Sequence, residues 1–427
     1  MKRALLLTYY APPRPAIASV RTDHLVRSLQ AHGWEVIPVL PQLDGVNYEP
    51  PVRTTGVTEF RAPVRRMLGV KDSETTHAHF HVERGSVLSP PTWKQRAIVA
   101  GHRVLSFADG RLGWLGPGVR AVKAMLRAER FDAVISTSPP VATHLVAARA
   151  HGNVPWIADL RDPWLRGDDL AGGPILRAID ELLEGFAFET AHALVTVSEP
   201  IAETLRTRYL NKAIYAVPNA FSNREWEAVP FVQPPAATFI HAGSLYHGLC
   251  NPRPFFEALA QLRHERLFAD GEVRVEFYGD REPWLQEEVE AYGLTGIVAL
   301  QGRVPREEIH VRERAASRLL IVARDGPEER GTYTGKLFEY LGARRKIIAI
   351  GGRDERTVMD EALAITGAGA RCRDVAGLRR AIIEAIEEWR RGETATLEPQ
   401  AVAPFELSQF GARYAAILEE VLQRCSA

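Results

Sequence analysis

Short apolar runs alternate with amphipathic helical stretches along most of the chain. They include ALLLTYY at 4–10, DAVIST at 132–137 and ATFIHAG at 237–243, and runs of this kind predict buried strands. The full set of predicted strands covers 4–10, 35–40, 132–137, 155–160, 192–198, 237–243, 273–279, 297–302, 318–323 and 346–352. Because these strands alternate with helices, the pattern predicts parallel sheets covered by helices on both faces.

The alternation of strands and helices stops near the middle of the chain and then starts again. The interruption at 218–236 holds four prolines and shows no periodicity, which is typical of an interdomain linker. The fold class is therefore predicted to be α/β, with two doubly wound, Rossmann-like domains in tandem, at 1–217 and 237–404. Residues 42–95 fit neither pattern and predict a loop-rich insertion in the first domain.

The topology also predicts where a ligand binds. Open parallel sheets bind ligands at the carboxyl ends of their strands. Two such domains that face one another enclose a cleft, so we expect a site built from the strand-end loops of both domains.

Composition narrows the class of protein. The 427 residues include 53 Lys+Arg and 53 Asp+Glu, and this zero formal charge disfavours a nucleic-acid binder. The three cysteines lie far apart, which argues against a disulfide framework and fits a reducing compartment. No stretch approaches the ~20 apolar residues of a membrane helix. We therefore expect a cytoplasmic protein, soluble or at most associated with the inner face of a membrane.

Basic residues are concentrated in one part of the first domain. Residues 61–130 contain 13 Lys and Arg against 5 Asp and Glu. This surplus indicates either an ordinary solvated face or a surface that approaches anionic lipid or a phosphorylated acceptor. Trp93, Phe107 and Trp114 are interleaved with it, and they suit either membrane contact or the core of the domain.

The segment GTYTGKLFEYLGARRKIIAIGG, at 331–352, predicts a loop, a helix from about Lys336 and then a strand. A helix N-terminus offers unpaired N–H groups and a partial positive charge, which suit a diphosphate. Lys336 in the first turn opposes the helix dipole, so a bound anion would offset both. Glu339, one turn later, either accepts hydrogen bonds from a pair of ribose hydroxyls or is an ordinary glutamate of the helix surface.

A second loop, HAGSLYHGLCNPRPFFEAL at 241–259, follows a predicted strand and precedes a predicted helix. Gly243 and Gly248 would permit close approach of the backbone to a ligand, and Arg253 could reach a phosphate. The alternative is a plain strand-to-helix turn. Both loops would line the same edge of the sheet.

The order of these segments resembles a known family. YYAPPRPAIASVRTDHL at 9–25 and WIADLRDPW at 156–164 are similar to parts of its N-terminal domain, and AGSLYHG at 242–248, LQGRVPREEI at 300–309 and GKLFEYLGARRKIIAI at 335–350 follow in the family's order. The chain is thus similar to the GT4-like glycosyltransferases (glycosyl transferases group 1) of the GT-B fold, and most of all to members that build bacterial surface polysaccharides. The helix at about 405–427 resembles the segment that returns to the N-terminal domain.

The resemblance implies a nucleotide-sugar site in the second domain. Glu339 corresponds to the second glutamate of the family's E-x7-E signature, which holds the donor's ribose, and Lys336 lies where a diphosphate contact is expected. The full set of residues implied for the donor is Gly243, Ser244, Tyr246, Arg253, Gly302, Arg303, Val304, Thr332, Tyr333, Thr334, Gly335, Lys336, Leu337 and Glu339. Gly302 to Val304 would flank the base, and Thr332 to Gly335 would face the donor sugar.

This chain departs from the family pattern at three places. The first glutamate of E-x7-E falls at Gly331, with Glu328 and Glu329 nearby but out of register. Leu249 stands where the family often has an arginine, for which Arg253 is the candidate substitute. The first loop has Pro15-Ala16-Ile17-Ala18 in place of a glycine pair. These changes indicate an altered donor geometry or a partly degenerate enzyme.

We expect neither a metal ion nor another cofactor. Cleavage of a sugar–phosphate bond develops negative charge on the leaving diphosphate, which a helix dipole, Lys336 and an arginine can stabilise. Asp168 and Asp169 lie in a glycine-flanked loop and are more typical of a solvated turn. His77, His79 and His81 alternate as on one face of a strand and could bind a metal, but they fall in the irregular insertion, which disfavours a functional site.

Candidates for the acceptor side come from the first domain. Asp162 and Asp159, in DLRDPW at 159–164, follow a predicted strand, and Arg161 between them could steady an aspartate or a phosphate. Asp162 is the best acidic candidate for catalysis, and a purely structural Asp–Arg pair is the alternative. Arg21 on the first helix faces the acceptor or covers a surface. The resemblance implies retention of anomeric configuration.

The leading hypothesis is a retaining transferase that moves a sugar from a nucleoside-diphosphate donor to a lipid-linked or saccharide acceptor. A transferase for a soluble small molecule is the nearest alternative, and a sugar-nucleotide epimerase shares the fold. A catalytically silent scaffold protein is the non-enzymatic alternative, and Gly331 and Leu249 are the residues that support it.

Overall fold

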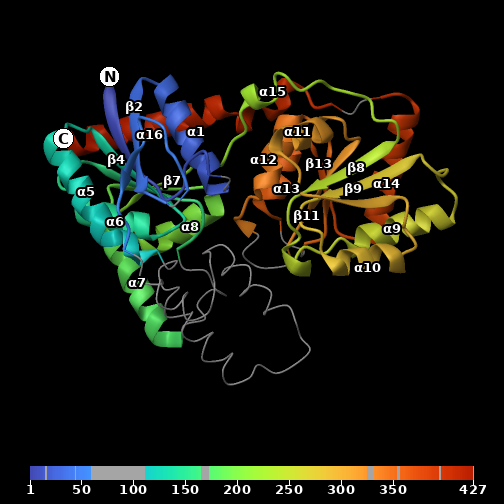
Figure 1. Cartoon of the computed structure of the whole chain (residues 1–427), viewed down its shortest axis with the longest axis horizontal. Helices are drawn as coiled ribbons and strands as arrows, with labels where there is room; N and C mark the ends of the chain where they lie inside the picture. Colours follow the sequence, from blue (N-terminus) through green and yellow to red (C-terminus); the bar gives the residue numbers. More distant parts are fainter. Residues whose placement is uncertain are drawn as a thin grey trace. The chain divides into compact units, whose positions relative to one another are not determined.

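The computed structural model describes residues 1–14, 17–43, 45–58, 111–164, 173–324, 330–352, 356–393 and 396–426. They form two compact units (Figure 1), Met1–Pro218 with Phe410–Ala427, and Asn219–Gln409. Most of the expected insertion at 42–95 lies outside the described residues, but its first part contains a strand, Arg53–Thr55. Among the described helices, none is both long enough and apolar enough to cross a membrane.

The first unit contains a seven-stranded parallel sheet in the order β3-β2-β1-β4-β5-β6-β7. Chain order reverses at the β1–β4 pair, which makes this a doubly wound sheet. The strands are β1 Lys2–Leu7, β2 Trp34–Pro41, β3 Arg53–Thr55, β4 Ala133–Ser138, β5 Trp156–Leu160, β6 Ala193–Thr196 and β7 Ala213–Ala216. The helices are α1 Ile17–Ala31, α5 Leu115–Ala128, α6 Ala142–Ala150, α7 Gly173–Thr190, α8 Glu199–Arg208 and α16 Leu407–Ser426.

The second unit contains a six-stranded sheet in the order β10-β9-β8-β11-β12-β13. Its strands are β8 Ala237–Ala242, β9 Val273–Tyr278, β10 Val298–Gly302, β11 Arg318–Val322, β12 Ile347–Ile350 and β13 Gly369–Cys372. The helices are α9 Arg253–His264, α10 Pro283–Ala291, α11 Arg306–Arg314, α12 Gly335–Ala343, α13 Val358–Thr366, α14 Val375–Arg390 and α15 Pro399–Val402. Its strands also pair in parallel, so the predicted α/β class with two doubly wound domains is confirmed.

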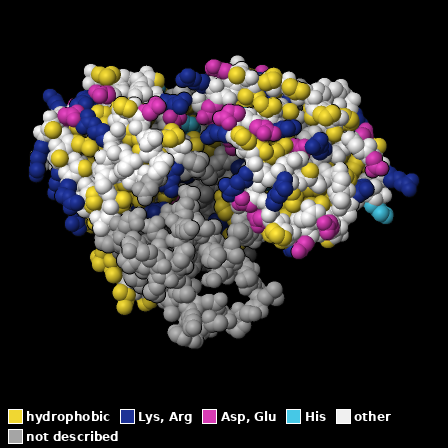
Figure 2. All heavy atoms as spheres, in the orientation of Figure 1, with side chains coloured by type: hydrophobic (Ala, Val, Ile, Leu, Met, Phe, Trp, Pro, Cys, Tyr) yellow, Lys and Arg dark blue, Asp and Glu magenta, His cyan; other side chains and the backbone are white. Residues whose placement is uncertain are grey.

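Two apolar cores lie on the two faces of the second sheet. One contains side chains of α9, α10 and α14, such as Phe255, Leu285 and Ile382. The other contains side chains of α11, α12 and α13. On the face that Figure 2 shows, acidic and basic side chains are interspersed over this unit.

The segment that we expected to be a linker, 218–236, is packed into the second unit from Asn219 onward. Trp226 is 1% exposed and, with Phe221, belongs to the core that covers α12. The prolines and the lack of periodicity gave no sign that Phe221 and Trp226 are buried. An irregular segment can be held against a core by single large side chains.

An ion pair lies in the interior of the first unit. Asp159 on β5 is fully buried and accepts hydrogen bonds from Arg21 of α1 at 2.6 and 2.9 Å, and from Thr137 Oγ1 at 2.7 Å. Arg21 is 2% exposed and stacks over Phe410 of α16. Our expectation that Arg21 faces an acceptor or covers a surface is therefore corrected. The pair occupies the Asp159 carboxylate, which leaves it poorly suited to act as a base.

Substitution of Asp159 by Asn should destabilise the first unit strongly. The Arg21 guanidinium would remain buried without its counter-charge, and breaking a buried pair in this way costs about 3–5 kcal/mol. Urea unfolding followed by circular dichroism measures the loss. The matched control is Asp23→Asn, which removes the surface pair with Arg27 and should cost less than about 1 kcal/mol. Equal losses in the two variants would contradict the interpretation.

Candidate functional site

The carboxyl ends of β8, β9 and β10 are joined through glycine backbone. Gly243 follows β8, and its N–H donates to Tyr278 O at 2.7 Å, while the Gly279 N–H donates to Gly302 O at 3.0 Å. A Cβ atom on Gly279 would lie 2.6 Å from Gly243 O, and both residues have positive φ, 143° and 125°. Side chains would therefore separate the loops, and glycine lets them pack backbone to backbone.

Lys336 crosses over Gly243. A Cβ atom on Gly243 would lie 2.6 Å from Lys336 Cε and 3.0 Å from Nζ, and Nζ donates to Ser244 O at 3.5 Å. Burial lowers the pKa of Lys336, while interactions with Cys250 and Glu339 act in the opposite direction. Lys336 lies in the first turn of α12, so an ammonium group and a helix N-terminus meet above the end of β8.

Glu339 lies on α12 one turn beyond Lys336, with 27% of its side chain exposed. Its Oε1 is 3.2 Å from His310 Nε2 and 3.9 Å from a terminal nitrogen of Arg306. Burial raises the pKa of Glu339, but the hydrogen bond from His310 and the charges of Arg306 and Lys336 lower it more. The pKa therefore lies below its usual 4.5, and the carboxylate is ionised at neutral pH.

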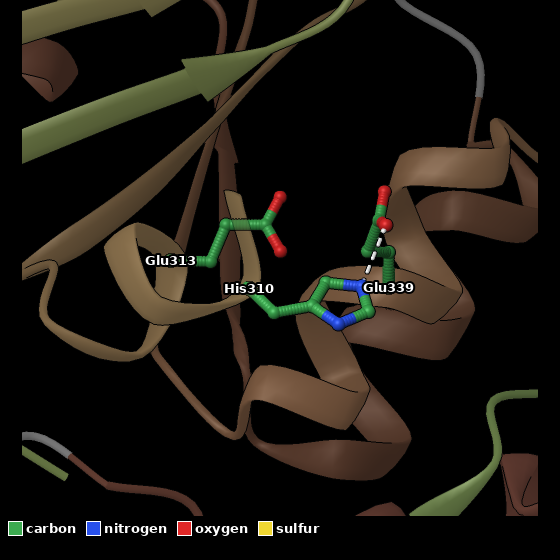
Figure 3. A group of neighbouring side chains, drawn as sticks. All are labelled: His310, Glu313 and Glu339. Carbon is green, nitrogen blue, oxygen red and sulfur yellow. Dashed lines mark hydrogen bonds and ion pairs between the residues drawn. The ribbon is translucent and has the colours of Figure 1, made fainter. Parts of the chain in front are cut away.

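His310 and Glu313 lie three residues apart on α11, and both side chains extend toward Glu339 on α12 (Figure 3). Glu313 is fully buried, and within the described part of the chain neither of its carboxylate oxygens has a hydrogen-bond partner. Burial, and then the charge of Glu339, raise the pKa of Glu313 well above 4.5. The buried carboxyl group is therefore held in its protonated, neutral form over a wide pH range.

The side chains of His310, Glu313 and Glu339 could hold a cation, since their ligand atoms lie within 4.8 Å of one another. Arg306 already places a positive charge there, with Nε 3.4 Å from His310 Nε2 and a terminal nitrogen 3.9 Å from Glu339. A metal ion would have to displace that guanidinium group, which disfavours a metal site.

Sequence reasoning identified Glu339 but missed His310 and Glu313. The helix sequence REEIHVRER, at 306–314, is so rich in charge that no apolar stripe shows which face is buried. The His-x-x-Glu spacing was the one available signal, because residues three apart share a face of a helix.

The structure brings together part of the predicted donor set. Gly243, Ser244, Lys336 and Glu339 meet at the β8 edge and on α12. Tyr246 has φ 52° and stands 47% exposed in the same loop. Its backbone N–H donates to Ser244 Oγ at 3.0 Å.

Other members of the set have structural contacts of their own. Arg253 pairs with Glu288 at 2.6 Å with its side chain 52% exposed, which makes it a poor substitute for the missing phosphate arginine. Leu337 is fully buried in the core, so it supports α12 rather than facing a ligand. Arg303 forms two hydrogen bonds with Asp280, at 2.7 and 3.0 Å.

The remaining residues lie along the loops. Gly302 ends β10, Val304 packs against the core beside α12, and the Tyr333 ring contacts Phe338 edge-on at 5.4 Å. Thr332 is half-buried, and Thr334 is the residue that precedes α12, which begins at Gly335. Arg161 and Asp162 are half-buried after β5. Outside the described residues lie Pro15, Ala16, His77, His79, His81, Trp93, Phe107, Asp168, Asp169, Glu328 and Glu329.

Replacement of Glu313 by Gln should change how stability depends on pH. Because the folded-state pKa of Glu313 is raised, the folded state binds the extra proton, and wild-type stability falls as pH rises above the unfolded value of 4.5. Each pH unit between the two pKa values costs about 1.4 kcal/mol. Gln is neutral and of the same shape, so the variant should lose this slope and become the more stable protein near pH 8.

Chemical denaturation from pH 5 to pH 8 measures the effect, with the exposed Glu287→Gln as the control. Parallel pH profiles for wild type and the Glu313 variant would contradict the prediction.

Comparison with known proteins links the N-terminal part of the chain to glycosyltransferases. Residues 18–220 match the family model described as a glycosyl transferase 4-like domain. A search of curated proteins found no match.

Solved structures are similar along nearly the whole chain. Sucrose-phosphate synthase from Thermosynechococcus elongatus has a TM-score of 0.61 at 13% identity, over 99% of this chain and 100% of that one. A TarM mutant from S. aureus, in complex with fondaparinux, alpha-GlcNAc-glycerol and UDP, has a TM-score of 0.58 at 9% identity, over 98% of this chain and 100% of that one. The lipopolysaccharide outer core galactosyltransferase WaaB has a TM-score of 0.58 at 13% identity, over 98% of this chain and 100% of that one.

At these identities the structural similarity shows the fold, and the family match covers somewhat less than half of the sequence, all of it in the N-terminal part. The chain therefore has the GT-B fold, and its residues 18–220 are similar to the glycosyl transferase 4-like domain.

Proposed function

We propose that the protein is a glycosyltransferase that binds a nucleoside-diphosphate sugar in its second unit and transfers the sugar to a saccharide or lipid-linked acceptor with retention of configuration. The observation that carries this proposal is the arrangement of Lys336 and Glu339 on one helix, with Lys336 crossing the backbone of Gly243. A cation and an ionised carboxylate one turn apart match the two chemically different parts of such a donor.

The diphosphate would bind at the N-terminus of α12. Thr334, which precedes the helix, makes no side-chain capping hydrogen bond, so the first N–H groups of the helix suit an anion. Lys336 adds a full positive charge at the same place. As the sugar–phosphate bond breaks, negative charge grows on the leaving diphosphate, and we propose that these groups stabilise it without a metal ion.

The ribose would bind at Glu339. Its lowered pKa keeps the carboxylate ionised, and a charged acceptor makes stronger hydrogen bonds with hydroxyl donors than a neutral one. Asp162 after β5, with Arg161 beside it, remains the proposed acidic group on the acceptor side.

The acceptor is proposed from the resemblance to transferases of bacterial surface polysaccharides. WaaB acts, by its name, in the lipopolysaccharide outer core, and sucrose-phosphate synthase shows that the fold also serves small soluble products. On the described surface, Ile175, Ile179, Leu182 and Phe186 form an exposed apolar row on α7, where apolar side chains protrude in Figure 2. The row favours peripheral contact with a membrane, and co-sedimentation with liposomes separates this proposal from a soluble acceptor.

A panel of nucleotides tests the donor site. We expect one of UDP, GDP, dTDP, ADP and CMP to raise the melting temperature, because a ligand at 100 times its dissociation constant stabilises the native state by about 2.7 kcal/mol. Glu339→Ala should remove most of the shift, since the ribose loses a charged acceptor worth about 1.5–3 kcal/mol. Glu287→Ala, an exposed helix variant, should keep it. The absence of any shift for the wild type would favour the scaffold alternative that Gly331 and Leu249 support.

Gly243→Ala should weaken binding of the same nucleotide about tenfold or more by displacing Lys336, whose Cε would lie 2.6 Å from the new methyl group. The matched control is Gly293→Ala, which also has positive φ but has open space around its Cβ position. Titration calorimetry on both variants shows whether the loss of affinity is specific to the Gly243 position. Equal affinity in the two variants would show that the position of Lys336 does not matter.

A further inference from the structure

We propose that His310 is a positioning residue for Glu339 and thereby sets the selectivity of the site for ribose over deoxyribose. The proposal rests on the assignment of Glu339 to the donor's ribose. It adds a residue that neither the sequence patterns nor the family resemblance assigned to the site.

The His310 ring is fixed from behind. It is 6% exposed and stacks on Trp226, with ring centroids 4.3 Å apart and planes tilted by 31°. Trp226 is itself held, because Arg314 donates to its carbonyl oxygen at 2.8 Å and its ring lies so close to Gly342 that a Cβ atom there would be 2.3 Å from Nε1. The imidazole therefore has little freedom to turn away from α12.

The proton of His310 belongs on Nε2. This nitrogen is 3.2 Å from Glu339 Oε1, and without a proton between them two lone pairs would face one another. Arg306 Nε also approaches Nε2, at 3.4 Å, but that guanidinium has an alternative partner in Glu225 at 3.0 Å. A carboxylate is the stronger acceptor, so the Nε2–H donates to Glu339.

This hydrogen bond gives the two Glu339 oxygens different roles. Oε1 is bound to the confined His310 ring, and Figure 3 shows the other oxygen pointing away from His310. A carboxylate held in one rotamer presents that free oxygen in a fixed direction. A carboxylate fixed in this way can distinguish a ribose, which has two neighbouring hydroxyl groups, from a deoxyribose, which has one. Arg306 is 46% exposed and pairs with Glu225, so it is less able to impose such an orientation.

Glu313 favours the same arrangement. It faces Glu339 from α11, and an ionised Glu313 would compete for the His310 proton and repel the Glu339 charge. Because burial keeps Glu313 neutral, Glu339 is the carboxylate that receives the His310 hydrogen bond.

Two substitutions separate the hydrogen bond from the packing. His310→Phe keeps an aromatic ring against Trp226 and removes the donor. His310→Gln removes the ring and keeps an amide N–H at a reach similar to Nε2. His310→Asn, whose amide is too short, is the second donor-deficient variant if the Phe variant has a lowered melting temperature. His264→Gln, at an exposed position at the end of α9, is the control.

The measured quantity is the ratio of dissociation constants for each 2′-deoxynucleoside diphosphate and its ribonucleotide, with UDP, GDP and ADP as probes. We expect the wild type and His264→Gln to prefer the ribonucleotide about tenfold or more. His310→Phe and His310→Asn should lower the ratio to near one, and His310→Gln should retain most of it. A purely structural role for His310 would weaken both nucleotides equally and leave the ratio unchanged.

The failures of the two proposals are distinguishable. If the wild type binds none of the probes, or binds both sugars equally, the assignment of Glu339 to ribose is wrong and this inference falls with it. If the wild type discriminates and the folded His310→Phe and His310→Asn variants discriminate equally well, the ribose assignment stands and the role of His310 is overturned.

Discussion

The contact between Lys336 and the backbone of Gly243 is the constraint on which the second unit's strand edge depends. A lysine in the first helical turn opposes the helix dipole, and here its charge is also partly removed from water. Both unfavourable effects occur where the loop after β8 has a glycine, Gly243, which leaves room for the Lys336 side chain. The arrangement places positive charge beside the N-terminus of α12, and the same helix carries Glu339.

The two units use buried charge in opposite ways. In the first unit Asp159 pairs with Arg21 and accepts a further hydrogen bond from Thr137, so the ion pair holds β5 to α1. In the second unit neither oxygen of Glu313 has a hydrogen-bond partner among the described residues, and Glu339 has only part of its hydrogen-bonding capacity filled. A satisfied pair stabilises the fold, whereas an incompletely satisfied group is the usual mark of a place where a ligand binds.

The sequence was sufficient for the architecture because buried parallel strands leave continuous apolar runs. It also placed Lys336 and Glu339 on one helix, because both positions follow from where that helix starts. It was insufficient for 219–236, where burial depends on Trp226 rather than on periodicity. It also failed for Arg21 and Asp159, since residues 138 positions apart in the chain give no local sign that they meet. His310 and Glu313 were hidden in a helix whose charged composition resembles a solvated surface.

The glycine contacts at the ends of β8, β9 and β10 have a consequence for the evolution and engineering of specificity. Gly243 is hydrogen-bonded to Tyr278, and Gly279 to Gly302, so the three loops are linked edge to edge through main-chain atoms. A larger residue at Gly279 cannot be absorbed by a side chain of the neighbouring loop, because the atom that it would meet is Gly243 O. The three loops therefore act as one structural unit. To exchange nucleotide preference between related proteins, all three loops would have to be replaced together.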